Sequence, residues 1–245
     1  MALKSSMNFG SWRFLVLMTL CLGAFLGLIA FSVGSRNRQQ QKEVPSKDRL
    51  RWHAKEAKKE GRQTVVIPTP IIEYVGSKNR GLDHILDEYT IVTAQVVATR
   101  TVQADDNNLI TWYKFVITDS LTPIRTPACL SCLTLTPPSD MPIDYSREFL
   151  VPKAGGTLMV DGVTVVQREG GFPELQQNQS YLLFLAMYPN RVGLIMGGPR
   201  GAFTIDKDLK IGAIFKEPDQ VQDQLKSKFD NSVGELKRHL QKNRK

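Results

Sequence analysis

The chain has few of the residues on which catalysis, metal binding and cross-linking usually depend. Its 245 residues include three cysteines and three histidines. Three cysteines cannot build a disulfide framework, and so few histidines limit any metal or acid-base site made from imidazoles. The G-x-S-x-G, H-E-x-x-H, P-loop and G-x-G-x-x-G patterns are also missing, which removes the motif evidence for common hydrolases, metalloproteases and nucleotide-binding proteins. The length excludes a large multidomain enzyme.

The excess of positive charge is confined to the first quarter of the chain. Residues 1–62 hold 12 of the 32 basic residues and 4 of the 24 acidic ones, which leaves 20 of each sign in residues 63–245. Binding to nucleic acid normally requires a basic face on the folded body. We therefore expect no nucleic-acid partner.

A run without a charged residue occupies positions 14–34. At about 1.5 Å per residue, these 21 residues match a hydrocarbon core about 30 Å thick. We expect a transmembrane helix here, preceded by a tail at 1–13, and hence a single-pass membrane protein whose first partner is the lipid bilayer. A cleavable signal peptide and a buried helix of a soluble core are the alternatives.

Two signals conflict over the side of the membrane on which the body lies. Basic residues are more numerous within 20 positions after the span than before it, which favours a cytoplasmic body. A short tail, one span and a β-rich domain are instead the usual plan of an exported, anchored protein. We expect an extracytoplasmic body, with the charge distribution as evidence against it.

Residues 35–62 are rich in Lys, Arg, Gln and Glu and nearly free of aliphatic side chains. Such a segment does not bury enough apolar surface to fold alone, so the composition predicts a basic spacer. Either residues 49–60 form a solvated helix that holds Trp52 near the lipid headgroups, or the whole spacer is a disordered linker.

The body, residues 63–210, has the pattern of a mainly β domain. An extended edge segment is expected at 63–76, followed by a short helix at 82–88. Residues 92–99 alternate as in a half-buried strand, and a turn at 105–108 leads to a second strand at 109–119 that completes a hairpin. Further strands are expected at 157–167, 181–187, 192–196 and 202–205. The run 181–186 is apolar without alternation, which indicates a central strand covered on both sides.

The order of these motifs carries a resemblance to a known group of domains. The motifs are the helix and first strand at 82–97, the aromatic hairpin partner, Gly155-Gly156-Thr157, Tyr181-Leu182-Leu183-Phe184-Leu185 and Gly201-Ala202-Phe203. Over residues 80–206 the chain resembles the OB-like β-barrel domains of exported or anchored bacterial proteins, which are distantly similar to netrin and metalloproteinase-inhibitor domains. The resemblance implies an OB-like small barrel.

Two departures from that pattern limit what the resemblance implies. The N-terminal cysteine through which the inhibitor family contacts proteases has no counterpart after the apolar run. The insertion at 121–152 has no fixed place in the pattern. Protease inhibition is therefore not expected.

Cys129 and Cys132 form the only motif with chemical content, a C-x-x-C pair. Such a pair can be a disulfide that staples a loop, an inert reduced pair, a redox-active dithiol or half of a zinc site. A thioredoxin-type site needs a helix after the first cysteine, and the following Thr134, Thr136, Pro137 and Pro138 do not favour one. We expect a structural disulfide outside the cytoplasm.

Two further groups invite a ligand hypothesis. Arg200, between glycines, is a candidate ligand contact. Asp83, His84, Asp87 and Glu88 combine three carboxylates with a histidine, but successive helix positions point in different directions, which favours a solvated face. No metal site and no cofactor are expected.

The C-terminal residues 217–243 have the pattern of one amphipathic helix. Its apolar stripe consists of Val221, Leu225, Phe229, Val233, Leu236 and Leu240. The stripe packs on the barrel, pairs with a helix of a protein partner, or lies on a membrane surface.

These features together predict a single-pass, membrane-anchored β-barrel module for binding or assembly, without catalysis. A thiol-disulfide redox protein using Cys129 and Cys132 is the alternative, and an anchored hydrolase is a further alternative. The sequence names no ligand.

Overall fold

The computed structural model describes residues 47–69, 81–105, 107–126, 135–169, 171–215 and 219–243. The expected span at 14–34 and the pair Cys129 and Cys132 lie outside these residues, so both stay predictions. Within the described ranges, no helix combines the length and apolarity needed to cross a bilayer.

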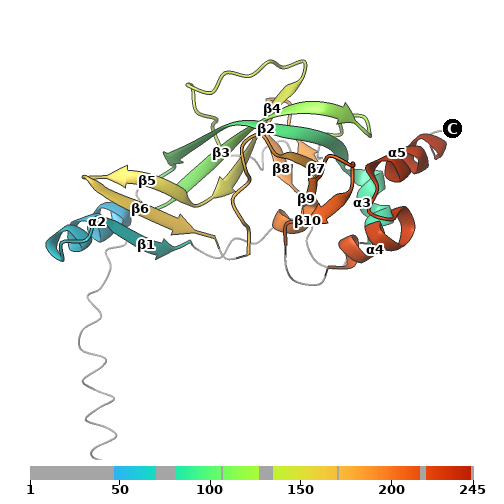
Figure 1. Cartoon of the computed structure of the whole chain (residues 1–245). Coiled ribbons are helices and arrows are strands. Elements are labelled where there is room, and N and C mark those ends of the chain that lie inside the picture. Colours follow the sequence, from blue (N-terminus) through green and yellow to red (C-terminus); the bar gives the residue numbers. More distant parts are fainter. Residues whose placement is uncertain are drawn as a thin grey trace, which may run out of the picture. The chain divides into compact units, whose positions relative to one another are not determined.

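The fold is mainly β, as the sequence predicts, and its strands form two sheets (Figure 1). The larger sheet contains β2 (Thr90–Gln103), β3 (Leu109–Ser120), β4 (Glu148–Ala154), β7 (Ser180–Met187), β8 (Gly193–Ile195), β9 (Ala202–Ile205) and β10 (Ile211–Ala213). The smaller sheet contains β1 (Thr64–Pro68), β5 (Gly156–Val160) and β6 (Val163–Arg168). The helices are α2 (Arg49–Lys59), α3 (Leu82–Glu88), α4 (Gln220–Phe229) and α5 (Val233–Lys242), with a short 3₁₀ helix, η2, at Gly198–Gly201.

The centre of the larger sheet confirms the predicted hairpin and the predicted central strand. β2 pairs antiparallel with β3 on one side and with β7 on the other, and β7 also pairs with β9. β7 is buried from Tyr181 to Met187, because both faces of the sheet are covered there. Two register shifts in β2, at Thr93/Ala94 and Val96/Ala98, interrupt the ladder with β3, and such bulges bend a sheet.

The OB-like small barrel that the sequence predicts is not found as a closed barrel. The larger sheet has the order β10-β9-β7-β2-β3-β4, with β8 added beside β7, so its path remains open. Closure would need a ladder between β4 and β8. The described residues form one isolated bridge there, between Leu150 and Val192. The three residues of β8 form their ladder with β7, and β5 and β6 pair with β1 in the smaller sheet.

The chain passes from the larger sheet to the smaller one at Gly155 and Gly156. Both have positive φ values, 82° and 138°, which favour glycine. A Cβ at Gly156 would lie 2.2 Å from Thr111 Oγ1, and one at Gly155 would lie 2.4 Å from the Gln167 carbonyl oxygen. The two glycines therefore let β4 and β5 approach β3 and β6 closely.

The single strand expected at 157–167 is two strands, β5 and β6, joined as a hairpin. Asp161 and Gly162 form the connection, with φ values of 50° and 82°. Positive φ at both central residues is typical of a type I′ turn, for which Asp-Gly is a preferred pair.

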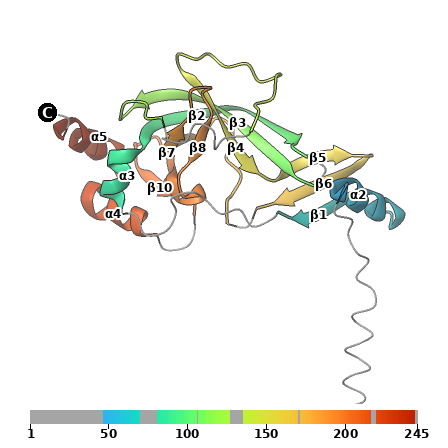
Figure 2. The ribbon, with the colours of Figure 1, turned by 180° about the vertical axis from the view of Figure 1, so that it is seen from behind.

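Residues 47–62 differ from the expected solvated spacer. α2 forms, but Leu50, Ala54 and Ala57 are buried against the smaller sheet, in one apolar cluster with Ile67 and Val165. Figure 2 shows α2 lying against β1 and β6. Small and aliphatic residues at four- and three-residue spacing supply this buried face within an otherwise charged segment.

The single C-terminal helix expected at 217–243 is two helices, α4 and α5. Asp230 and Asn231 both adopt the left-handed conformation and end α4. The Ser232 hydroxyl accepts a hydrogen bond from the Glu235 amide and caps α5. The intervening backbone pairs with the β10 region, where the Ile211 amide donates to the Asn231 carbonyl at 2.7 Å.

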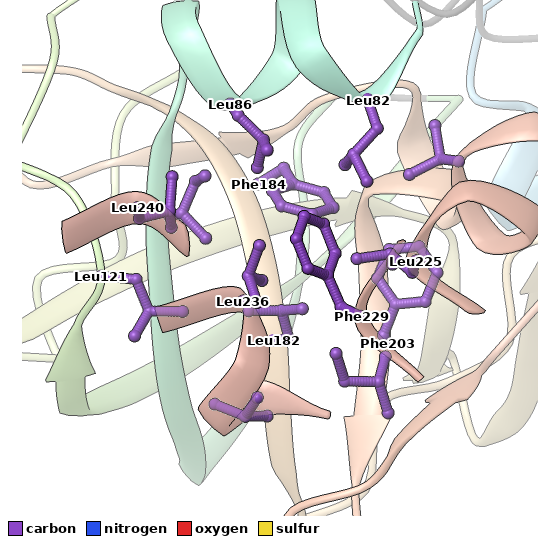
Figure 3. Packing of buried hydrophobic residues seen from close by; sticks show 14 of the residues in the cluster. Leu82, Leu86, Leu121, Leu182, Phe184, Phe203, Leu225, Phe229, Leu236 and Leu240 are labelled. Carbon is purple, nitrogen blue, oxygen red and sulfur yellow. The ribbon is translucent and has the colours of Figure 1, made fainter. Parts of the chain in front are cut away.

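The predicted apolar stripe is buried on the chain's own sheet, which confirms the first of its three interpretations. All six stripe residues are at most 8% exposed. Together with α3 they cover Leu182, Phe184 and Phe203 of the larger sheet (Figure 3). We call this packing the helix-covered face. The stripe itself is therefore not available to a protein partner.

Candidate functional site

A pocket of about 530 Å³ lies where the two sheets meet. It is lined from the larger sheet by β4 and by the segment after β10, from the smaller sheet by the end of β6, and by the loop that follows β6. The lining residues are Lys153, Gln167, Arg168, Glu169, Gly171, Phe172, Pro173, Glu174, Ile214 and Phe215. We call this site the seam pocket.

Lys153 is the unusual cation of the seam pocket. It follows Phe149 and Val151 at two-residue spacing on the inward face of β4, and its residue is 5% exposed. Its ammonium makes one long hydrogen bond, 3.5 Å to the Ala154 carbonyl, and lies 5.5 Å from the centre of the Phe172 ring. Burial lowers the pKa of Lys153, and the charge of Glu174 opposes that shift.

No carboxylate lies within 4 Å of the Lys153 ammonium in the described part of the chain. Lysines are rarely fully buried unless they are paired, because desolvating an ammonium is costly. A neighbouring lysine shows the usual arrangement, since Lys114 on β3 contacts Glu148 at 2.8 Å and donates to the Pro142 carbonyl at 2.7 Å.

Glu169 is the second unsatisfied group of the seam pocket. Its Oε2 atom is buried and has no hydrogen-bond partner among the described residues. Burial raises the pKa of this carboxyl to about 7. Near neutral pH the group is therefore close to evenly divided between a carboxylate and a neutral acid that can donate a hydrogen bond.

The loop that carries Phe172 is tied to the larger sheet by two tyrosines. The Tyr181 hydroxyl accepts a hydrogen bond from the Gln176 amide at 2.8 Å. The Tyr113 hydroxyl is hydrogen-bonded to the backbone of Leu175, although burial is the largest influence on Tyr113 and raises its pKa to about 12. Phe172 is consequently buried in the core with its ring beside Lys153.

The smaller-sheet side of the seam pocket is fixed by Gln167, which is 1% exposed. Its Oε1 accepts from the Leu109 amide at 2.6 Å, and its Nε2 donates to the Asn107 carbonyl at 3.3 Å. Both bonds join the end of β6 to the start of β3. Residues of both sheets, and not of a loop alone, therefore form the walls of the pocket.

Arg200, the predicted ligand contact, lies beside the seam pocket but is not one of its lining residues. Its Nε is 3.3 Å from the Asp219 carboxylate, and its guanidinium carbon lies 5.6 Å from the centre of the Phe215 ring. Phe215 lines the pocket. Arg200 thus contacts a pocket residue and is itself already partnered by Asp219.

The other predicted groups are not brought to this pocket. His84 contacts Glu88 at 3.0 Å, and Asp83 contacts Lys228 of α4 at 2.7 Å. The described residues contain no cluster of three side chains suited to a metal ion.

Sequence reasoning missed the seam pocket, although one signal for it was present. Lys153 continues the alternation of Phe149 and Val151, which places a lysine at an inward position of a strand. The strand itself lies in the segment that the sequence left unassigned. Glu169 carried no such signal, because its burial depends on the loop that folds over it.

Comparison of the chain with protein-family models and with curated proteins gave no match. The chemistry of the seam pocket is therefore read from its residues. It offers a buried ammonium, a carboxyl that titrates near neutrality and an apolar wall of Phe172, Pro173, Ile214 and Phe215.

Proposed function

We propose that the chain is a membrane-anchored binding module that takes a small amphipathic ligand in the seam pocket and does not transform it. The observation that carries this proposal is a 5% exposed lysine, Lys153, that has no ion-pair partner among the described residues and lies in the wall of a 530 Å³ pocket. Pockets of about 300–1,000 Å³ with a mainly apolar lining and a few polar groups are typical ligand sites. A buried charge without a partner opposes folding, and a ligand that supplies the partner offsets that cost.

The test of binding uses the full chain in lipid nanodiscs, titrated with small aromatic probes and followed by amide NMR. Phenylacetate, phenylacetamide and phenethylamine share an aromatic body and differ in charge. We expect at least one probe to shift the amide signals of Phe172, Ile214 and Phe215, with no shift in Phe215→Ala. If none of the three probes moves these signals, the binding function is wrong.

The anchor and its orientation remain part of the proposal. The charge-free run at 14–34 supports the anchor, and the plan of a short tail, one span and a β-rich domain supports the extracytoplasmic orientation. We expect the full chain to stay with membranes after carbonate washing and to need detergent for extraction. A C-terminal reporter fusion that is active in the cytoplasm would overturn the extracytoplasmic orientation.

The likeness to OB-like and netrin-like domains is proposed as a relation of fold alone. Its support is the antiparallel run β2-β3-β4 with β7 returning beside β2, which fits a partly open OB-like arrangement. The likeness implies no activity for this chain.

Two carboxyl groups in one pocket favour an anchored hydrolase as the second candidate. With a pKa of about 7, Glu169 carries a proton at neutral pH in part of the molecules, as a general acid must, and Glu174 lines the same pocket. Glycoside hydrolysis uses such a pair. Release of nitrophenol from nitrophenyl glycosides by the full chain, lost in Glu169→Gln, would support this candidate, and equal release by both proteins would remove it.

The redox alternative rests on Cys129 and Cys132, which lie outside the described residues. A reversible dithiol titration that is lost in Cys132→Ser would support it. A disulfide that resists mild reductants would instead support the structural staple.

A further inference from the structure

The charges around the seam pocket are unequal in their need for a partner. Lys153 is buried, and Arg168 at the end of β6 adds a second cation to the lining. Of the two lining acids, Glu174 is exposed and its charge is solvated, whereas Glu169 has a pKa of about 7. Among the described residues, the buried ammonium of Lys153 is therefore the group that most lacks a counter-ion.

A ligand anion and a ligand cation would have different consequences in this pocket. An anion facing Lys153 forms a charge-assisted hydrogen bond in a desolvated site, the strong class of such bonds. Glu169 tolerates the anion, because taking up a proton near pH 7 costs little and turns the carboxyl into a donor. A cation could pair with ionised Glu169, but it would face Lys153 and Arg168 across the same space.

The end of the seam pocket that contains Lys153 is next to an apolar wall. Phe172 is buried in the core, and the half-buried Phe215 ring lies 5.6 Å from the Arg200 guanidinium carbon, so both rings line the pocket without the ligand. Preformed rings reduce the ordering cost of binding. The wall suits a flat apolar body attached to the anion.

We propose that the seam pocket binds a small amphipathic carboxylate, with the carboxylate on Lys153 and the apolar body against Phe172 and Phe215. This inference rests on the proposed binding function and names the chemical class of its ligand. The same chemistry occurs in a free monocarboxylic acid and in the C-terminal residue of a peptide that ends in an aromatic side chain. We assign the free acid, because the pocket volume is that of a small-molecule site.

The experiment compares probes of equal shape and different charge by calorimetric titration of the full chain in nanodiscs, with empty nanodiscs as the blank. We expect phenylacetate to bind on the order of tenfold more tightly than phenylacetamide, and phenethylamine to bind least. In Lys153→Met the acid and the amide should bind equally. Lys207→Met, which removes one lysine from an exposed turn, should keep the preference for the acid.

Different outcomes separate the ligand class from the binding function. If the amide or the amine binds as tightly as the acid, and Phe215→Ala abolishes that binding, the pocket functions but the carboxylate class is wrong. If Phe215→Ala changes no titration, the proposed function is wrong. A persistent tenfold preference for the acid in Lys153→Met would also overturn the assignment to Lys153.

A second arm distinguishes the two sources of the carboxylate. A short peptide ending in phenylalanine with a free carboxylate is compared with its C-terminal amide. Weaker binding of the free peptide than of phenylacetate supports the free acid. Tighter binding of the free peptide, lost on amidation, overturns that source and assigns a peptide terminus.

Discussion

The helix-covered face and the seam pocket flank the same larger sheet and differ in whether their buried polar groups have partners. Beneath the helices the cluster is wholly apolar, and two side chains accept hydrogen bonds from amides at the starts of helices. The Gln224 side chain accepts from the Leu82 amide at 2.5 Å, and Asp219 Oδ1 accepts from the Val221 amide at 2.7 Å. Asp219 Oδ2 is buried without a hydrogen bond but lies 3.3 Å from Arg200 Nε, which supplies an opposite charge. In the seam pocket, the described residues give the buried Lys153 no counter-ion and give Glu169 Oε2 no hydrogen-bond donor.

Residues of the helix-covered face therefore stabilise the fold, whereas the unpaired polar groups of the seam pocket lower the free energy of unfolding. Natural proteins pair nearly all of their buried polar groups, so exceptions require an explanation. A ligand site is one such explanation, because a preorganised group that lacks a partner gains one on binding. Substitutions on the two sides of the sheet should therefore change stability with opposite sign.

The largest effect is expected on the helix-covered face. Phe229 of α4 is 4% exposed and packs with Leu182 and Phe203 of the sheet. Phe229→Ala should lower the free energy of unfolding by about 3–5 kcal/mol, through lost burial and the cavity left behind. Urea unfolding followed by circular dichroism measures it. Val66→Ala, at an exposed strand position, is the control and should change stability by less than about 0.5 kcal/mol.

A loss of less than about 1 kcal/mol in Phe229→Ala would mean that α4 is peripheral. The helix-covered face would then contribute little to the stability of the fold.

The two lysines of neighbouring strands should respond in opposite directions. Lys153→Met replaces an unpaired buried ammonium with an apolar chain and should raise the free energy of unfolding by about 1–2 kcal/mol. Lys114→Met leaves Glu148 without its 2.8 Å partner and should lower it by about 1–2 kcal/mol. The same urea titration measures both variants. Destabilisation by Lys153→Met comparable to that of Lys114→Met would show that Lys153 is already satisfied within the fold.

The stability of the pocket should also depend on pH through Glu169. Its pKa rises from 4.5 to about 7 on folding, because burial disfavours the charged form. Between these values the folded chain holds a proton that the unfolded chain releases, so this contribution to stability falls as the pH rises from 4.5 to 7. With Glu169 partly solvated, the loss should be about 1–2 kcal/mol.

Glu169→Gln should remove that contribution and leave a flatter profile from pH 4.5 to 7. The check is the difference between the two urea-unfolding profiles over this range, since Lys153, Arg168 and Glu174 line the same pocket in both proteins. Parallel profiles would show that Glu169 has an ordinary pKa.

The sequence predicted the parts of the fold that depend on local pattern. The alternation at 92–99, the run at 181–186 and the helix at 82–88 each reflect residues a few positions apart, and the structure confirms them. Barrel closure depends on the pairing of distant strands, and the described residues of β4 and of the β8 region form one isolated bridge. The burial of α2 similarly depends on a sheet formed by residues 64–68 and 156–168.

The seam pocket was not predicted because its chemistry comes from long-range burial. Lys153 and Glu169 are ordinary charged residues in the sequence, and their environment is set by the loop through Phe172 and by the segment after β10. Arg200 was singled out for its flanking glycines, yet the structure gives it Asp219 and Phe215 as partners. A residue's neighbours in the chain did not reveal its partners in the fold.

The smallest expected effect concerns the break between α4 and α5, where the missed signal was local. Ser232 and Glu235 have the spacing of a capping box, and Asn231 tolerates the left-handed conformation before it. Ser232→Ala should cost about 0.5–1 kcal/mol, at the low end for such caps because the hydrogen bond to the Glu235 amide is 3.4 Å long. Ser227→Ala within α4 is the matched control and should be neutral or slightly stabilising, because alanine favours a helix interior. Equal effects of the two substitutions in urea unfolding would show that Ser232 does not cap α5, and that the sheet contacts of Asn231 alone separate the two helices.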